Sequence, residues 1–282
     1  MKFKVGLAIT AASFLMAAGL SLFLKFLLLI PIFSYGPIIF FVIVEALLLW
    51  GILDHKSPLF GRVFWRGPKK LRLMSLTFDD GPTEPYTSSI LDILKKYQVK
   101  ATFFVLGRKV ELYPEAVKKI VADGHEIGNH GYDHKVFPLK SLSGIKAEIK
   151  RTEDLILSLT GKKPALFRAP HGWKRPCLKK ALREAGYELV SWTAGVWDTD
   201  RPGEQKIIRR SLKTFRNGAI LLFHDGHGLE ENADCSQLVA ALPAIIESAL
   251  SQGFQFMTVS QLLELSRTPT ERRLRAKGEK EN

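Results

Sequence analysis

The sequence predicts an α/β fold with parallel strands, either an open sheet or a barrel, behind an N-terminal membrane segment. From residue 73 onward, apolar strand-like runs alternate with helical patterns, which favours parallel strands joined by helical crossovers. Several helical patterns end in a glycine followed by the next strand, at Gly124, Gly186 and Gly253. Polar motifs stand at the carboxyl ends of strands, where the loops of barrels build active sites.

The N-terminal apolar segment is long enough to cross a bilayer. Val5–Ile30 exceeds the roughly 20 residues that a helix needs to span the hydrocarbon core, and Lys25 lies near one end, where it can reach the interface. Pro31–Pro37 predicts a turn, and Ile38–Leu53 is a second apolar run that contains Glu45. Two arrangements stay open: a helical hairpin, or one span followed by an interfacial helix.

Charge bears on the side of the membrane and on the partners. Cationic residues flank both outer ends of the segment, so the positive-inside rule favours a hairpin with both ends in the cytoplasm. A single span would place the following domain outside, and the apolar stretch runs too far for a cleaved signal peptide. The formal net charge of +13 favours anionic membrane lipid as a partner, and no aromatic–basic interleaving supports nucleic acid. We therefore expect an integral protein of the cell membrane, with the cytoplasmic face favoured and the outer face open.

Composition divides the chain into four segments. These are a membrane segment at 1–54, a basic juxtamembrane linker at 55–72, a catalytic domain at 73–266 and a charged tail at 267–282, expected to be disordered. The strands predicted in the domain are Leu73–Phe78, Ala101–Leu106, Glu126–Asn129, Ala165–Arg168, Glu188–Trp192, Ala219–His224 and Phe254–Thr258. Helical patterns between them include Pro114–Asp123, Gly144–Leu159, Pro176–Ala185 and Gln237–Gln252.

Two adjacent carboxylates end the first predicted strand. Asp79 and Asp80 follow an apolar run, and partly desolvated like charges repel strongly unless a cation lies beside them. His130 and His134 are four residues apart and close enough to bind one ion; with Asp80 they form a two-histidine, one-carboxylate set with open positions. Such a histidine pair taken alone is more often solvated, but the carboxylates at another strand end favour a metal site. Asp79 is then free to take a proton from water.

Two further strand ends carry candidate residues. His224 ends a strong apolar strand and would protonate a leaving amine, although taken alone a histidine there more often caps the strand. Arg168 precedes a turn through Pro170 and can hold the ionised base in place, while backbone N–H groups after the proline face a developing oxyanion. Taken alone, an arginine at this position could equally well be a solvated surface residue that precedes a turn.

These motifs, in this order, resemble the polysaccharide deacetylases, the NodB-like enzymes of carbohydrate esterase family four. The Thr-Phe-Asp-Asp-Gly motif, the His-x-x-x-His pair, Arg-x-Pro-x-Gly and Leu-x-His-Asp all lie within Leu73–Leu265. The resemblance implies a distorted (β/α) barrel of seven strands, catalysis with one divalent metal ion, and hydrolysis of an N-acetyl group from an amino sugar with release of acetate.

The resemblance also implies roles for single residues. Asp79 corresponds to the catalytic base, Arg168 to the residue that orients it, and His224 to the catalytic acid. Asp198 corresponds to the aspartate that tunes the acid, with Asp200 as a rival. The implied metal ligands are Asp80, His130 and His134. The implied substrate-binding residues are Pro170, His171, Trp192, Trp197 and Leu222.

The chain departs from the family pattern at three positions. Gly131 replaces a hydroxyl residue that braces the metal loop, and His171 replaces a tyrosine. Thr199 replaces a tryptophan, whose space Trp197 would fill. No implied catalytic group is missing, so we expect an active enzyme rather than the alternative, a catalytically silent membrane-tethered carbohydrate-binding protein.

The ligand set favours zinc and tolerates cobalt, nickel or manganese. The expected substrate is an N-acetylated glycan such as peptidoglycan outside the membrane, or a lipid-linked amino sugar inside it. The sequence does not indicate an oligomeric state.

Overall fold

The computed structural model describes residues 18–25, 35–135, 137–228, 230 and 233–268. The chain separates into two compact units, Met1–Trp50 and Gly51–Asn282. Most of the first predicted apolar run and nearly all of the predicted tail lie outside the described residues.

Residues 18–25 are helical, and helix α2 spans Tyr35–Leu53, so that its last three residues belong to the second unit. The predicted second apolar run is therefore a helix. The predicted turn extends too far, because Tyr35–Pro37 already forms the first turn of α2, where a proline is tolerated. Among the described residues, α2 is the one helix long and apolar enough to cross a membrane, a test that signal sequences and core helices also pass. The hairpin stays a prediction.

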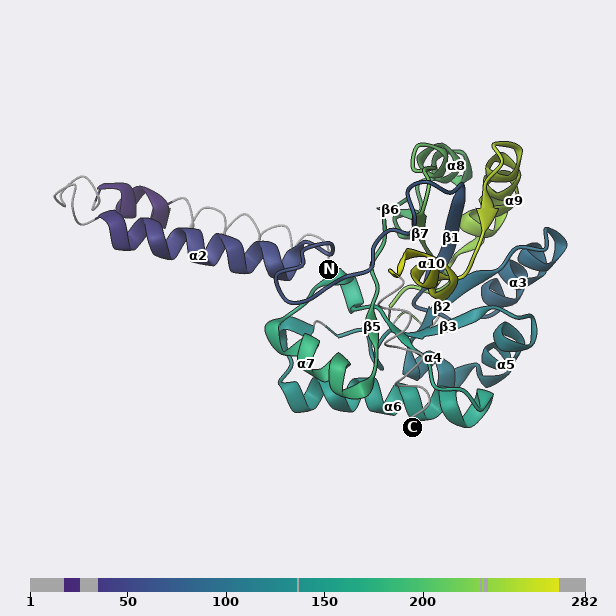
Figure 1. Cartoon of the computed structure of the whole chain (residues 1–282), viewed down its shortest axis with the longest axis horizontal. Helices are drawn as coiled ribbons and strands as arrows, with labels where there is room; N and C mark the ends of the chain where they lie inside the picture. The colour runs from purple at the N-terminus through teal and green to yellow at the C-terminus, as the bar shows by residue number, and fades with distance from the viewer. Residues whose placement is uncertain (1–17, 26–34, 136, 229, 231–232, 269–282) are drawn as a thin grey trace. The chain divides into compact units, whose positions relative to one another are not determined.

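The second unit is built on one parallel sheet that forms a half-barrel (Figure 1). Its path runs β5-β4-β3-β2-β1-β7-β6, and β8 pairs with the start of β1. The strands are β1 (Leu73–Asp79), β2 (Ala101–Val105), β3 (Glu126–Asn129), β4 (Leu166–Phe167), β5 (Glu188–Leu189), β6 (Ala194–Gly195), β7 (Ala219–His224) and β8 (Gln255–Phe256). All seven predicted strands are present, several of them shortened, and β6 was not predicted.

Helices cover the outer face of the sheet, except that the last one packs against Leu73, Phe104 and Ile220 on the inner face (Figure 1). They are α3 (Tyr86–Lys96), α4 (Gly107–Leu112), α5 (Pro114–Ala122), α6 (Leu142–Thr160), α7 (Pro176–Ala185), α8 (Glu204–Leu212), α9 (Ser236–Ser251) and α10 (Val259–Ser266). Short 3₁₀ turns occur at η2 (Phe137–Leu139), η3 (Pro170–Gly172) and η4 (Asp198–Asp200). The four named helical patterns correspond to α5, α6, α7 and α9.

Strand β1 shows how one sequence pattern supplies both core and site. Met74, Leu76 and Phe78 are fully buried in the main apolar core, which α3, α5 and α9 also line. Side chains alternate along a strand, so Thr77 and Asp79 face the other way, where both contact the guanidinium of Arg168. The pattern places a polar pair inside the curve of the sheet.

The segment 55–72, predicted as a linker, packs within this second unit. Phe64 forms a parallel bridge with Val190, and Arg66 forms an antiparallel bridge with Ala219. The Thr193 hydroxyl also donates to the Trp65 carbonyl at 2.7 Å. These residues occupy the opening between the end of β5 and the start of β7.

Candidate active site

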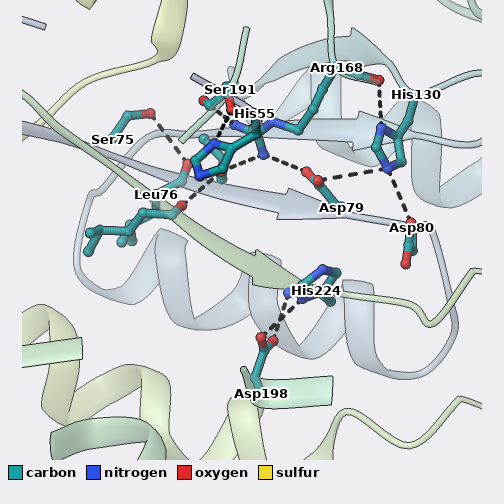
Figure 2. A network of polar contacts seen from close by, with 12 residues as sticks. His55, Ser75, Leu76, Asp79, Asp80, His130, Arg168, Ser191, Asp198 and His224 are labelled. Atoms are coloured by element: carbon teal, nitrogen blue, oxygen red, sulfur yellow. Dashed lines mark hydrogen bonds and ion pairs between the residues drawn. The ribbon is translucent and has the colours of Figure 1, made fainter. Parts of the chain in front are cut away.

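The predicted site residues meet because their strands are parallel and end at one edge of the sheet. Asp79, the last residue of β1, is in register with His224, the last residue of β7. His130 directly follows β3, and Arg168 directly follows β4. Four motifs that are far apart in the sequence thus surround one cavity (Figure 2).

Asp80, His130 and His134 form a group able to hold a metal ion. One ligand atom from each lies within 4.8 Å of the other two, with Asp80 Oδ1 3.3 Å from His130 Nε2 and 3.1 Å from His134 Nε2. Burial raises the pKa of Asp80, but the two imidazoles outweigh it and hold that pKa well below its usual range. The carboxylate is therefore ionised, as a cation ligand must be.

Contacts behind these ligands orient them. The Arg168 carbonyl lies 2.8 Å from His130 Nδ1, and since a carbonyl only accepts, Nδ1 carries the proton and Nε2 keeps its lone pair for a metal. Asp80 Oδ2 accepts from the Gly228 N–H at 2.8 Å. Asp80 Oδ1 is buried and has no hydrogen-bond partner among the described residues. A buried oxygen of that kind, facing two imidazole nitrogens, fits a cation.

Asp79 is held by a different partner. Arg168 Nη1 donates to Asp79 Oδ1 at 2.6 Å and to Thr77 at 2.8 Å, while Nη2 donates to the Ser191 carbonyl at 3.1 Å. The guanidinium also lies 4.0 Å from the centre of the Phe104 ring. Arg168 is fully buried and the Asp79 side chain is 4% exposed, so removing either partner would leave a buried unpaired charge at a cost of about 3–5 kcal/mol. The arginine fixes the position of this carboxylate.

His224 is paired with Asp198 and not with Asp200. Its Nδ1 lies 3.0 Å from Asp198 Oδ1, and its backbone N–H donates to Asp198 Oδ2 at 2.8 Å. Asp200 is exposed at the end of η4. Burial lowers the pKa of His224, but Asp198 and the more distant carboxylates outweigh it and raise the pKa to about 9. The imidazole is therefore protonated at neutral pH.

A cavity of about 460 Å³ opens over these groups. Of the predicted substrate-binding residues, His171, Trp192, Trp197 and Leu222 line it, and Trp197 is 67% exposed. Pro170 is buried and is not among the lining residues.

The cavity is lined by backbone in unusual conformations. Asp80, His134, His171 and Trp197 all have a positive φ, between 55° and 72°. The left-handed region is unfavourable for residues other than glycine and persists where the surrounding structure enforces it, often at functional sites. The surrounding structure therefore holds these four residues in a strained backbone conformation that directs their side chains toward the cavity.

Glu148 on α6 supports the loop between His130 and His134, in which Gly131 has no hydroxyl group to do so. Its Oε2 accepts from the backbone N–H of Tyr132 at 2.8 Å and of Asp133 at 3.3 Å, and Lys140 pairs with its other oxygen at 2.6 Å. Gly131 itself has φ +82°, a conformation that glycine adopts without strain.

Sequence reasoning missed several residues of the site. His55, Trp173 and His227 line the cavity, and Glu148 supports the loop behind it. The motif that precedes Trp173 was a usable signal for that residue. Nothing local in the sequence marks His55 or Glu148.

Comparison with known proteins shows the family to which this chain belongs. The family model described as polysaccharide deacetylase matches residues 66–190. A peptidoglycan-N-acetylglucosamine deacetylase of Bacillus cereus is 37% identical over 208 residues, which cover 72% of this chain and 93% of that protein.

Solved structures of similar fold are found as well. One of a peptidoglycan N-acetylglucosamine deacetylase matches with a TM-score of 0.68 and 31% identity, over 71% of this chain and 92% of that one. A pseudoenzyme of the CE4 family from Bacillus anthracis matches with a TM-score of 0.66 and 29% identity, over 72% of this chain and 69% of that one. By sequence, fold and the order of its motifs, this chain belongs to the polysaccharide deacetylase family.

Proposed function

We propose that this protein is a metal-dependent deacetylase that hydrolyses the N-acetyl group of an amino sugar in a glycan and releases acetate. One observation carries the proposal. Two adjacent carboxylates have separate partners, since Asp79 is fixed by Arg168 while Asp80 faces two imidazole nitrogens. That division supplies a base and a cation ligand side by side.

Asp80, His130 and His134 would hold the cation, with zinc the first choice and cobalt, nickel or manganese also compatible with the ligands. When bound, the ion supplies Lewis-acid polarisation of the acetamide carbonyl and lowers the pKa of water.

Asp79 acts as the general base. Its Oδ1 is held by Arg168, which leaves Oδ2, 3.8 Å from His130 Nε2, free to accept a proton from the attacking water. Arg168 keeps this carboxylate aimed at the cavity through its fixed bonds to Thr77 and Ser191. The base therefore needs no reorganisation when the reaction begins.

His224 acts as the general acid. Its Nδ1 is engaged by Asp198, so the proton on Nε2 is available to the leaving amine. On the third motif, the N–H groups of Gly172 and Trp173 already bond to the carbonyls of Ala169 and Pro170. We assign the backbone contact to the developing oxyanion to His171. Leu222 and Trp197 line the cavity and would contact the acetyl and sugar groups.

The substrate proposed first is a glycan containing N-acetylglucosamine, because the Bacillus cereus relative carries that substrate in its name. We propose that α2 anchors the protein in the cell membrane, which supports a polymer such as peptidoglycan or a lipid-linked amino sugar, according to the face on which the second unit lies. Anionic lipid is the proposed neighbour of the flanking basic residues.

The test is acetate release from N-acetylglucosamine oligomers by the purified full-length protein. Asp79→Asn removes the base and should reduce the rate about 10²–10⁴-fold. Treatment with a chelator should abolish the activity, and added zinc should restore it. Asp92→Asn, which alters an exposed carboxylate paired with Lys119, is the matched control and should match the wild type.

Full activity of Asp79→Asn, or of protein shown to be free of metal, would refute these roles. The alternative, a silent carbohydrate-binding protein, predicts oligosaccharide binding without acetate release. A pseudoenzyme is known among the solved structures of the CE4 family. Against the silent alternative, every proposed catalytic group is present here.

A further inference from the structure

His55 lies in the wall of the cavity, although it belongs to the segment that directly follows α2. Its ring stacks on Trp192, with centroids 4.0 Å apart and planes 10° from parallel, and both residues line the cavity. One residue separates His55 from Leu53, the end of α2. A residue of the cavity wall thus follows the end of the apolar helix almost directly in the sequence.

Lys174 fastens this segment to the loop of the third motif. Its Nζ donates to the carbonyls of Asp54 and Ser57, both at 2.8 Å, and its N–H donates to the carbonyl of Ile52 at 3.0 Å. Lys174 is 2% exposed, so these carbonyls replace water around its ammonium group. The segment 52–57 is therefore held against the loop that contains Lys174, and its His55 lines the cavity.

Gly172 shows how closely the two pieces pack. A Cβ atom at this position would lie 2.7 Å from His55 Cβ and 2.6 Å from the Trp192 ring. Real Cβ atoms do not approach so closely. Only glycine at position 172 therefore leaves room for His55 to stack on Trp192.

A short chain of contacts leads from His55 to the catalytic base (Figure 2). His55 Nδ1 lies 2.6 Å from the Ser191 hydroxyl, and the Ser191 carbonyl accepts from Arg168, which in turn holds Asp79. The Arg168 guanidinium also lies 5.8 Å from the centroid of the Trp192 ring.

Charge plays no part in this contact. Burial, with a smaller effect of Lys56, lowers the pKa of His55 to about 4. The imidazole is neutral at pH 7 and acts through stacking and one hydrogen bond.

We propose that His55 is a positioning and specificity residue of the deacetylase site. It holds the Trp192 ring in place in the wall of the cavity that receives the N-acetylated sugar, and through Ser191 it steadies Arg168 and the base. The inference rests on the proposed function, and it assigns the residues that follow the apolar helix to the substrate site.

Two substitutions separate the two roles. His55→Ala removes both ring and hydrogen bond, so KM for an N-acetylglucosamine oligomer should rise about five-fold, the value of an aromatic pair, and kcat should fall about five-fold with the lost hydrogen bond. His55→Phe keeps the ring alone, and should restore KM to within about two-fold of wild type while kcat stays low. Zinc affinity should be unchanged in both variants, because His55 contacts no proposed ligand.

His125→Ala is the matched control, because His125 is a histidine of the same unit whose Nδ1 accepts a hydrogen bond from the Ala101 N–H and which is not among the residues that line the cavity. After correction for the folded fraction, its KM and kcat should equal those of the wild type. The inference is overturned if His55→Ala behaves as this control does, or if His55→Phe fails to restore KM.

A wild-type protein that releases no acetate would contradict the proposed function and not this inference. Calorimetric titration with the same oligomer then decides the inference. About five-fold weaker binding by His55→Ala supports it, and unchanged binding overturns it.

Discussion

Replacing Asp198 with asparagine should make His224, the proposed catalytic acid, active only at low pH. Burial alone lowers the pKa of His224, and the paired carboxylate of Asp198 is the largest influence that raises it, to about 9 from the ordinary 6.5. A shift of this size corresponds to about 3 kcal/mol. The His224 side chain is only 20% exposed, so solvent does not screen the pair away. With Asp198 neutral, we expect the pKa to return to about 6.5, because the carboxylates of Asp80 and Asp79 still oppose the effect of burial.

The sign follows from the role of the acid, which must be protonated to act. At pH 8 an acid with a pKa near 9 is about 90% protonated, whereas one at 6.5 is about 3% protonated, which gives a loss of about 30-fold. At pH 6 the loss should be less than about two-fold. A bound cation would shift the pKa of His224 in the same direction in the variant and in the wild type. The quantity to compare is therefore the difference between the pH profiles of the two proteins.

The assay is the rate of acetate release at saturating substrate between pH 5.5 and 9, with metal content measured in each sample. Asp200→Asn is the control, because Asp200 is exposed and lies at the end of the same 3₁₀ turn; its pH profile should match that of the wild type. An equal loss for Asp198→Asn at pH 6 and pH 8, or a shifted profile for Asp200→Asn, would refute the assignment of the acid pair.

Two further predictions concern the metal loop and the fold. Glu148→Gln weakens the acceptor for the N–H groups of Tyr132 and Asp133, so zinc affinity measured by chelator competition should fall about ten-fold; an unchanged affinity would show that the loop needs no such brace. Burial lowers the pKa of His125 to about 4, below the ordinary 6.5 of the unfolded chain, so stability should be lost as the pH falls from about 6.5 towards 4. The melting temperature should therefore drop less between pH 7 and pH 5 in His125→Gln than in the wild type, and equal drops would contradict this account.

The site residues that could be predicted from the sequence are those that belong to short motifs at the ends of predicted strands. Asp79 and Asp80 end an apolar strand, and His130 and His134 are four residues apart, so the parallel sheet alone brings them to one edge. The choice between Asp198 and Asp200 could not be made from spacing, since both follow the same strand-like run. It required the contacts of His224.

The features that the sequence did not identify depend on contacts between distant parts of the chain. His55 meets Ser191 across 136 residues, and no periodicity near His55 indicates that meeting. Strand β6 was not predicted because it has two paired residues, Ala194 and Gly195, too few for an alternating pattern. Glu148 lies on a helix whose apolar face could be predicted from the sequence. The sequence did not indicate which loop the polar face of that helix contacts.

The bridges made by Phe64 and Arg66 bear on how the protein is synthesised. These residues leave the ribosome before the strands they pair with, and the Trp65 carbonyl accepts from Thr193, a residue made 128 positions later. Long-range pairings of this kind slow folding, because the intervening chain must be closed into a loop first. The opening of the half-barrel therefore closes late, after β7 has been made, while α2 and the residues before it have long since emerged. A stalled or truncated chain that ends before Ala219 would lack the Arg66 bridge and would expose the edge of β1 that pairs with β7, and would be a target for aggregation or proteolysis.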